Sequence, residues 1–443
     1  MTRGVIIGAP ASSSGKTTVT LGVLRALRHA GFVPRSAKVG PDYLDPKFHT
    51  AATGAPSYNL DSWAMREETL AQVALSASAD SDVVIVEGVM GLFDGAGPSD
   101  GSLVQGSTAD VARRTGWPVI LVVDASGMAA SVAALVHGFA TYHRDVNLVG
   151  VIFNQVGSER HDSLLRQSLS DSPVEVLGAL PRDDRLSVPS RHLGLVNAEE
   201  LASVEEFIDD AARIVAEHLD LERLMALATP LGPSAVGSSR PGCALPPLGQ
   251  HIAVARDIAF TFCYPTTLDG WRASGATIEF FSPLENEAPS HRADAVYLPG
   301  GYPELHAGRL ASASHFLTGL RAAAERNAFV YGECGGYMAL GETLIDKCGE
   351  RHRMSGLLPV NTSFAEPRMT LGYREITTLT TTPLGPRGAQ FRGHEFHFAQ
   401  TTREARSDRL FSAANASGDT VVRVGHQRAN VSGSFMHLID QRR

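Results

Sequence analysis

Residues 329–340 of this chain, FVYGECGGYMAL, restrict its fold more than any other stretch. A short apolar run enters a turn with the pattern Gly-x-Cys-x-Gly, and a helix-compatible segment leaves it. Glycines on both sides of Cys334 allow the sharp bend that projects one side chain from the end of a strand. The pattern therefore predicts a nucleophile elbow between a strand and a helix, with the Cys334 thiol as the catalytic nucleophile.

The same turn predicts how the thiol is activated. A cysteine at the start of a helix is close to backbone N–H groups and to the positive end of the helix dipole, which favour the thiolate and can hold an oxyanion. The alternative is a buried structural cysteine beside a glycine-rich turn. Five matched positions between a strand and a helix favour catalysis over that alternative.

Two glycines are expected to supply the oxyanion-binding amides. Residues 295–304, AVYLPGGYPE, are typical of a strand that ends in a glycine pair, which makes the N–H of Gly301 available to an oxyanion. Gly335 directly follows the nucleophile and is the natural second donor. We therefore predict that Gly301 and Gly335 form the oxyanion hole.

Two histidine clusters compete to supply the base for Cys334. One contains His394 and His397, and the other contains His437. His394 and His397 could also be metal ligands, but the sequence shows no evident third ligand, which disfavours a metal site. Spacing alone does not choose between the two clusters.

A phosphate loop is predicted near the beginning of the chain. Residues 8–18, GAPASSSGKTT, follow an apolar strand and precede a helical pattern. Small residues let backbone N–H groups close around phosphate, Lys16 would reach the β- and γ-phosphate oxygens, and Thr17 would ligate Mg²⁺. Pro10 stands where the usual pattern has its first glycine, but the remaining residues predict an ATP or GTP site. The nucleotide-binding candidates in this loop are Ser13, Ser14, Gly15, Lys16, Thr17 and Thr18.

Three charged residues after the second predicted strand are expected beside the phosphates. Lys38, Asp42 and Asp45 lie within residues 37–46, AKVGPDYLDP. In a doubly wound sheet the C-terminal strand ends face the ligand. We expect Lys38 to contact the nucleotide, Asp45 to ligate Mg²⁺ and Asp42 to meet phosphate or substrate. A solvated loop carboxylate is the alternative for either aspartate.

A further carboxylate follows a third predicted strand. Residues 83–86, VVIV, form a buried strand that delivers Glu87 at its C-terminal end, where a Mg²⁺-bound triphosphate would lie. The glycine-rich loop that follows carries Asp94, a second candidate for contact with phosphate or substrate. The predicted Mg²⁺ ligands are therefore Thr17, Asp45 and Glu87.

Two later segments carry weaker signals. Asn154 ends another predicted strand, and its amide could pair with adenine, although a turn or capping role is the alternative. Residues 179–183 and 191–195 contain cations that could receive an anionic substrate, with His192 as the candidate, or could be ordinary surface positions.

Composition and patterning bound the domain organisation. The chain has 443 residues and a net charge of −8, which gives no support to nucleic-acid or membrane-surface binding. Alternating strands and helices predict a doubly wound parallel sheet in residues 1–228 and an α/β domain in residues 250–443. Residues 229–249 are rich in Pro, Gly and Ser and are interpreted as a linker.

The cellular compartment is inferred from what the sequence lacks. Its four cysteines contain no CxxC pair, so neither a zinc ribbon nor a dense disulfide framework is indicated. The first residues have too short an apolar run for a signal peptide, and no run approaches the ~18 residues of a membrane span. We therefore expect a soluble protein in a reducing cytoplasm.

With both halves considered, the chain closely resembles the cobyrinic acid a,c-diamide synthase family of cobalamin biosynthesis, including its hydrogenobyrinic acid branch. The resemblance covers essentially the whole length. The first half resembles dethiobiotin synthetase in its serine-rich phosphate loop, Lys38, Asp42, Asp45 and the pair Glu87-Gly88. The second half resembles a class I glutamine amidotransferase in Pro299-Gly300-Gly301 and in Glu333-Cys334-Gly335-Gly336.

The resemblance implies a reaction and assigns the base. It places the amidotransferase histidine at His437, where Ile439 replaces the glutamate of triad enzymes and leaves a Cys-His dyad with a weaker base. Cys334 would release ammonia from L-glutamine. Mg²⁺ and ATP would activate the a and c carboxylates of a corrinoid acid as acyl phosphates, which ammonia displaces. The sequence does not decide whether the protein forms a homo-oligomer. It also does not decide whether the corrinoid carries cobalt.

Other functions fit the sequence less well. A regulatory P-loop ATPase of the partition type would carry a signature lysine where this chain has Ala11. A bare glutaminase or peptidase would leave the nucleotide site unexplained. Among relatives, nickel-sirohydrochlorin a,c-diamide synthase stays open, whereas cobyric acid synthase is disfavoured by the segments at residues 42–45 and 191–195.

Overall fold

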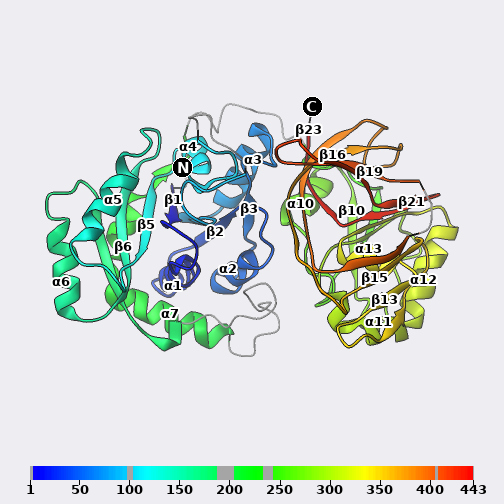
Figure 1. The fold of residues 1–443 in the computed structure, drawn as a ribbon, viewed down its shortest axis with the longest axis horizontal. Helices are drawn as coiled ribbons and strands as arrows, with labels where there is room; N and C mark the ends of the chain where they lie inside the picture. The colour runs from blue at the N-terminus through cyan, green and yellow to red at the C-terminus, as the bar shows by residue number, and fades with distance from the viewer. Residues whose placement is uncertain (1–2, 97–102, 187–203, 233–242, 405–407, 443) are drawn as a thin grey trace. The chain divides into compact units, whose positions relative to one another are not determined.

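The computed structural model describes residues 3–96, 103–186, 204–232, 243–404 and 408–442. The chain divides into two compact units. The first unit comprises Met1–Trp63 and Glu67–Pro241, and the second comprises Ala64–Arg66 and Gly242–Arg443. In Figure 1 the first unit runs from blue to green and the second from green to red.

A parallel sheet forms the centre of the first unit, with the strand order β3-β2-β4-β1-β5-β6-β7. Its strands are β1 (Arg3–Gly8), β2 (Pro34–Val39), β3 (Tyr58–Leu60), β4 (Val83–Glu87), β5 (Val119–Asp124), β6 (Leu148–Val156) and β7 (Glu175–Pro181). All of these pairings are parallel. Strands are added on both sides of β1, which confirms the predicted doubly wound arrangement and puts a ligand crevice at the C-terminal strand ends.

Helices surround this sheet (Figure 1). They are α1 (Lys16–His29), α2 (Asp45–Thr53), α3 (Glu67–Ser78), α4 (Thr108–Thr115), α5 (Ser131–Thr141), α6 (Glu159–Ser168), η1 (Asp184–Leu186), α7 (Val204–His218) and α8 (Leu221–Leu227). α1 is buried along most of its length and packs against α7. A β-carbon at Gly22 in α1 would lie 2.8 Å from the carbonyl oxygen of Ala211 in α7. This close contact fixes the helix that begins at the phosphate loop.

The second unit contains a six-stranded sheet with the order β10-β9-β11-β12-β22-β21. The strands are β9 (His251–Ala255), β10 (Thr277–Phe281), β11 (Ala295–Leu298), β12 (Phe329–Glu333), β21 (His426–Arg428) and β22 (Val431–Ser434). All pairings are parallel except that of β21 with β22. The accompanying helices are α10 (Pro265–Ala273), η4 (Pro303–His306), α11 (Ala307–Ser312), α12 (Ser314–Glu325) and α13 (Gly335–Leu340).

Two further sheets, which we did not predict, complete the second unit. One has the order β14-β13-β15-β18, from β13 (Thr343–Ile345), β14 (Arg351–Arg353), β15 (Val360–Ser363) and β18 (Gln400–Glu404). The other is antiparallel with the order β20-β19-β16-β17-β23, from β16 (Thr370–Thr378), β17 (Gln390–His397), β19 (Phe411–Asn415), β20 (Val421–Val424) and β23 (Met436–Arg442). Many residues of β16 are only half-buried, so their alternating pattern in the sequence is weak.

The segment predicted as a linker, residues 229–249, contains ordered structure at both ends. Its first two residues form β8 (Thr229–Pro230), which pairs antiparallel with β1 in the first unit. Leu245 and Leu248 are buried in the core of the second unit. Residues 233–242 lie outside the described part of the chain.

Within the residues that the structure describes, no helix combines the length and the apolar character needed to cross a membrane.

Candidate functional site

The phosphate loop connects β1 to α1. Gly15 caps the helix with a left-handed φ of 92°, and a β-carbon there would lie 2.1 Å from Nδ2 of Asn154, so only glycine fits. The same Asn154 amide donates to the carbonyl of Ser14 at 3.1 Å. Lys16 Nζ donates to the carbonyls of Ala11 at 3.2 Å and Met90 at 2.7 Å. The Lys16 side chain therefore folds back over the phosphate loop, where it is expected to contact the nucleotide.

Glu87 is the centre of a buried ionic network at the end of β4. Its Oε1 accepts from Thr17 Oγ1 at 2.6 Å and from Lys38 Nζ at 2.9 Å, and its Oε2 contacts His49 Nε2 at 2.6 Å. Lys38 also pairs with Asp45 Oδ2 at 2.7 Å. The structure thus brings together Thr17, Lys38, Asp45 and Glu87, as predicted, and adds His49, which the sequence did not single out.

The pKa values indicate which members of this network are charged. Burial raises the pKa of Glu87, but Lys38 and His49 outweigh it and hold the carboxyl well below its ordinary value. Burial likewise lowers the pKa of Lys38, and the neighbouring Asp45 and Glu87 more than reverse that effect. The pKa of Lys16 falls to about 8, because of burial and the nearby charge of Lys38. The Lys38 ammonium and the Glu87 carboxylate are therefore ionised partners.

The oxygens in this network fit a divalent cation. Thr17, Asp45 and Glu87 offer hydroxyl and carboxylate oxygens, the donors that Mg²⁺ prefers. Asp45 Oδ1 is buried and has no hydrogen-bond partner among the described residues. Burial, followed by the charges of Asp42 and Glu87, raises the pKa of Asp45, so an additional cation would stabilise its ionised form.

The remaining candidates in the first unit are Asp42, Asp94 and His192. Asp42 Oδ1 accepts from the backbone N–H of Leu44 at 2.6 Å and lines a pocket beside the phosphate loop. Asp94 Oδ2 accepts from Gly91 N at 2.9 Å, so it shapes the loop after β4. His192 lies outside the described residues.

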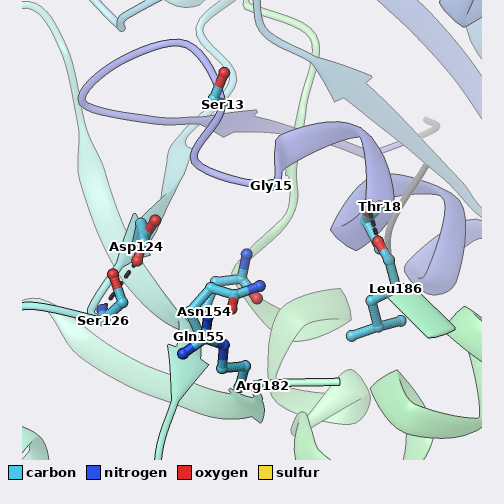
Figure 2. A pocket seen from close by; sticks show the side chains of 9 residues that line it. All are labelled: Ser13, Gly15, Thr18, Asp124, Ser126, Asn154, Gln155, Arg182 and Leu186. Carbon is cyan, nitrogen blue, oxygen red and sulfur yellow. Dashed lines mark hydrogen bonds between the residues drawn. The ribbon is translucent and has the colours of Figure 1, made fainter. Parts of the chain in front are cut away.

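Two pockets meet at the phosphate loop. One, of about 490 Å³, is lined by Ser12, Ser13, Gly15, Lys16, Thr17, Thr18, Lys38, Asp42, Glu87, Gly88, Val89 and Met90. The other, of about 360 Å³, is lined by Ser13, Gly15, Thr18, Asp124, Ser126, Asn154, Gln155, Arg182 and Leu186 (Figure 2). Gln155 belongs to the loop at residues 154–158 that was predicted to read the base, whereas Asp124 and Ser126 were not predicted. Asp124 ends β5 and Ser126 lies just beyond it, and this position at a C-terminal strand end is the signal that could have identified them.

In the second unit, Cys334 lies between β12 and α13 with a φ of 47° and a ψ of −103°. A positive φ is rare for a residue other than glycine and marks a strained turn. A β-carbon at Gly336 would lie 1.9 Å from the carbonyl oxygen of Leu298, so the start of α13 packs directly on β11. This is the backbone geometry that the Gly-x-Cys-x-Gly pattern predicts.

The two predicted oxyanion glycines are neighbours. The amide nitrogen of Gly301 lies 3.0 Å from the position that a β-carbon of Gly335 would occupy. The N–H of Gly335 donates to the Cys334 thiol group and favours its ionised form. The N–H of Gly335 therefore lies beside the sulfur, and the amide nitrogen of Gly301 lies close to Gly335, an arrangement that suits an oxyanion hole.

The two competing histidine clusters are cross-strand neighbours. β17 pairs with β23 so that His394 is opposite His437, and their rings stack with centroids 4.7 Å apart. His437 and the Cys334 thiol both hydrogen-bond to the backbone of Phe396, the thiol at 3.4 Å from its carbonyl oxygen. A β-carbon at Gly300 would lie 2.7 Å from Cε1 of His437 and 3.4 Å from the β-carbon of Cys334. This geometry favours His437 as the base.

The other two histidines have different partners. His394 Nε2 contacts the Tyr264 hydroxyl at 2.9 Å, and His397 Nε2 contacts Glu395 Oε1 at 3.0 Å. His397 also stacks on Phe435, with ring centroids 3.9 Å apart. His394 and His397 thus make separate contacts and do not form a shared ligand set.

Burial keeps the thiol and the imidazole neutral. It raises the pKa of Cys334 far above the ordinary value, with the nearby Glu304 adding to the effect, and the N–H of Gly335 offsets only part of this. Burial, together with His394 and His397, lowers the pKa of His437 well below its usual range. The expectation that the elbow favours a thiolate is therefore wrong for the free protein, because desolvation outweighs the backbone amides.

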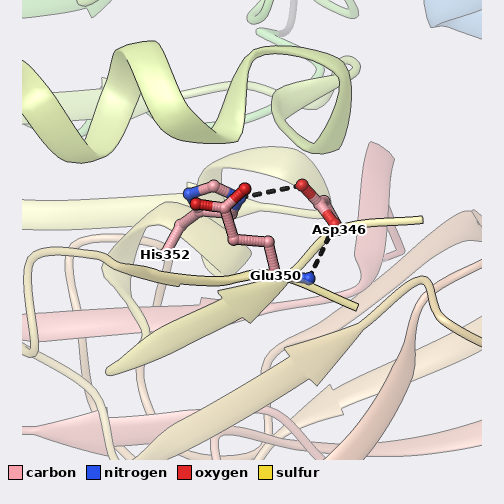
Figure 3. Close-up of side chains that lie close together, drawn as sticks. All are labelled: Asp346, Glu350 and His352. Atoms are coloured by element: carbon pink, nitrogen blue, oxygen red, sulfur yellow. Dashed lines mark hydrogen bonds and ion pairs between the residues drawn. The ribbon is translucent and has the colours of Figure 1, made fainter. Parts of the chain in front are cut away.

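A group of two carboxylates and one histidine elsewhere in the second unit also has side chains spaced closely enough to hold a metal ion. Asp346 Oδ2 pairs with His352 Nε2 at 2.9 Å, and Asp346 Oδ1 accepts from the backbone N–H of Glu350 at 3.0 Å (Figure 3). These contacts close the hairpin between β13 and β14, which accounts for the cluster without a metal.

Comparison with known families supports the predicted domain type of each half of the chain. Residues 5–196 match the CobQ/CobB/MinD/ParA nucleotide binding domain, and residues 251–443 match the CobB/CobQ-like glutamine amidotransferase domain. The fold class predicted for the two halves is confirmed. The fold and site define a glutamine-dependent, amide-forming ligase, in which a nucleotide-binding domain and an amidotransferase domain share one chain.

Full-length relatives identify the family. The chain is 53% identical over 439 residues to the hydrogenobyrinate a,c-diamide synthase of Rhizobium meliloti (strain 1021), covering 99% of each chain. It is 51% identical over 441 residues to that of Brucella abortus biovar 1 (strain 9-941), covering 99% of this chain and 98% of the relative. The chain therefore belongs to the hydrogenobyrinate a,c-diamide synthase family.

Proposed function

We propose that this chain uses ATP and glutamine to amidate the a and c side-chain carboxylates of hydrogenobyrinate in cobalamin biosynthesis. The observation that carries the proposal is the full-length identity of 53% to a relative named for that reaction. The phosphate loop and the Cys334–His437 pair supply the two chemical activities that such a reaction needs. Neither activity alone would form an amide from a carboxylate and glutamine.

In the second unit, the proposed reaction begins with the neutral pair. His437 takes the proton from the Cys334 thiol as the sulfur attacks the side-chain amide carbon of glutamine. The N–H groups of Gly301 and Gly335 hold the tetrahedral oxyanion. The histidine then returns the proton to the leaving ammonia, and water hydrolyses the thioester to glutamate.

In the first unit, an oxygen of the substrate carboxylate attacks the γ-phosphorus of ATP and ADP leaves. The resulting acyl phosphate is attacked by ammonia at its carbonyl carbon, and phosphate departs. Lys16 stabilises the charge on the transferring phosphoryl group. Thr17, Asp45 and Glu87 would hold Mg²⁺, which when bound neutralises phosphate charge. Ser13, Ser14, Gly15 and Thr18 bind phosphate, and Lys38 keeps the carboxylates in place.

Asn154 and the residues around it are proposed to receive the rest of the nucleotide. Asn154 lines the 360 Å³ pocket that adjoins the phosphate loop, together with Asp124 and Gln155. Because its Nδ2 already donates to Ser14, its contribution to the nucleotide would be through loop geometry and its amide oxygen.

We propose residues 1–228 as the ATP-dependent amidoligase domain and residues 250–443 as the amidotransferase domain. The division into two compact units and the ranges of the two family matches support these boundaries. The cytoplasm is the proposed compartment, since all four cysteines are free.

The test is turnover with purified protein, Mg·ATP and glutamine. Metal-free hydrogenobyrinate is supplied in one reaction and cobalt-containing cobyrinic acid in the other, and amide groups are counted by mass spectrometry. We expect two amides on the metal-free macrocycle. The proposal is contradicted if neither macrocycle is amidated, or if only the cobalt-containing one is.

A further inference from the structure

Glu333, the residue before Cys334, is a buried carboxyl group with no role in the reaction as described so far. It is 3% exposed at the end of β12. Its Oε2 accepts from the Tyr297 hydroxyl at 2.9 Å, and its Oε1 accepts from the Tyr331 hydroxyl at 3.2 Å. Burying a carboxyl group costs free energy, so a position that retains one beside a nucleophile requires an explanation.

The same carboxyl group reaches the strand that carries the base. Glu333 Oε1 accepts from the backbone N–H of Leu438 at 3.3 Å, directly after His437. Glu333 Oε2 lies 4.0 Å from Nδ1 of His437. One side chain therefore links the nucleophile's strand to the base's strand and lies beside the imidazole nitrogen that triad enzymes orient with an acid.

We infer that Glu333 positions His437 for proton transfer with Cys334, taking the place of the acid that is absent at Ile439. The inference rests on the proposed glutaminase reaction of Cys334 and His437. Glu333 does not touch glutamine, so it acts through the imidazole. As His437 takes the thiol proton, a carboxylate beside Nδ1 stabilises the imidazolium and holds the ring in the productive orientation.

The protonation state of Glu333 gives the inference a measurable signature. Burial raises the pKa of Glu333 to about 7, and the hydrogen bond from Tyr297 is the largest effect that lowers it. The titratable groups around this carboxyl group and His437 are Tyr297, Tyr331, Cys263, Cys334, His394, His397 and Glu395. Burial displaces the pKa values of Tyr297, Tyr331, Cys263, Cys334 and His394 well away from 7. Burial raises the pKa of Glu304, which lies near Cys334, to about 8. A limb near pH 7 in the pH–rate profile of the glutaminase is therefore assigned to Glu333 by its loss when Glu333 is replaced.

The first test is the glutaminase activity of Glu333→Gln. We expect kcat to fall roughly 10- to 100-fold, less than the ~10⁴-fold for a directly hydrogen-bonded triad acid, because 4.0 Å exceeds hydrogen-bond length. KM for glutamine should change less than about two-fold, and the limb near pH 7 should disappear. Hydrogen exchange of peptides from the second unit, followed by mass spectrometry, checks that this unit is folded.

The second test is Tyr297→Phe, which keeps the carboxyl group and removes one hydrogen bond to it. Since that bond lowers the pKa of Glu333, its loss should move the limb of the profile to higher pH. The inference is overturned if folded Glu333→Gln keeps the wild-type kcat and profile, or if Tyr297→Phe leaves the limb in place. Either result would leave the proposed function intact. Glutaminase activity surviving in Cys334→Ser would instead contradict the proposed function itself.

Discussion

The two candidate sites use opposite electrostatic strategies. In the first unit, Lys38 and Glu87 are buried and remain charged because each is paired with an opposite charge. In the second unit, Cys334 and His437 are buried and remain neutral because burial outweighs the groups that would favour their charged forms. Similar burial thus leaves one pair charged and the other neutral. The difference is whether each buried group has an oppositely charged neighbour.

The contrast follows from the chemistry expected at each site. In phosphoryl transfer the protein itself takes little part in covalent chemistry. Preorganised charges around the phosphates supply most of the catalysis. Thiol attack on an amide needs a proton to move from sulfur to imidazole and then to the leaving ammonia, which starts from a neutral pair. The predictions below test whether the two strategies are separable.

The largest effect is expected from Cys334→Ser. Glutamine-dependent synthesis should fall by at least about 10³-fold because the nucleophile is lost, whereas synthesis from added ammonium salts should persist. Both rates are measured by mass spectrometry of the amidated product. Cys348→Ser, at an exposed cysteine of the same unit, is the matched control and should keep both activities. Loss of the ammonia-dependent reaction in Cys334→Ser would show that the sites are not separable.

Glu87→Gln should reduce synthesis from both nitrogen sources. We expect a loss of about 10²- to 10³-fold, since the substitution removes the charge that pairs with Lys38 and would bind Mg²⁺. The rates with glutamine and with ammonium are compared in one assay. Glu67→Gln, whose side chain is 82% exposed, serves as the control and should behave like the wild type. Equal rates in the Glu87 variant and the wild type would remove Glu87 from the nucleotide site.

Gly336→Ala should destabilise the second unit by about 2 kcal/mol, because the new β-carbon would overlap the Leu298 carbonyl. Hydrogen exchange of peptides from each unit, followed by mass spectrometry, measures the change. Gly138→Ala is the matched substitution in the first unit, where an added β-carbon meets nothing within 4 Å, and it should be neutral or stabilise α5 by about 0.5–1 kcal/mol. Similar results for both variants would mean that α13 does not pack directly on β11.

His394→Gln should make the second unit less sensitive to acid. Burial lowers the pKa of His394 from 6.5 to about 3, so between these values the unfolded chain binds a proton that the folded protein does not. The stability from this residue is therefore present above pH 6.5 and declines as the pH falls, by about 1.4 kcal/mol per pH unit. Unfolding free energies at pH 7 and pH 5.5 give the slope. A variant with the wild-type slope would show that His394 is not buried in its neutral form.

Local patterns in the sequence predicted the features that a few adjacent residues determine. The phosphate loop around Lys16 and the turn at Cys334 are set by glycines, small residues and neighbouring apolar runs, and the structure has both. The doubly wound sheet followed from alternating strands and helices. The pattern behind each prediction spans about 20 residues or fewer, although the sheet itself pairs strands that are far apart in the sequence.

Features that depend on distant contacts were not predictable in the same way. The sequence left His394 and His437 as rivals, because their relation is set by pairing between β17 and β23. The neutral state of Cys334 depends on how completely the surrounding unit buries it, which no local pattern reports. The contact of His49 with Glu87 likewise requires the packing of α2 on β2, the strand that pairs with β4.

A double isotope experiment tests the central claim most directly. The substrate carboxylates are labelled with ¹⁸O and the glutamine amide with ¹⁵N, and product and released phosphate are analysed by mass spectrometry. If a thiol frees nitrogen while a nucleotide site activates the acid, each new amide carries ¹⁵N and each phosphate released with it carries one ¹⁸O from the substrate. Phosphate without ¹⁸O would contradict activation through an acyl phosphate, and amides without ¹⁵N would contradict glutamine as the nitrogen source.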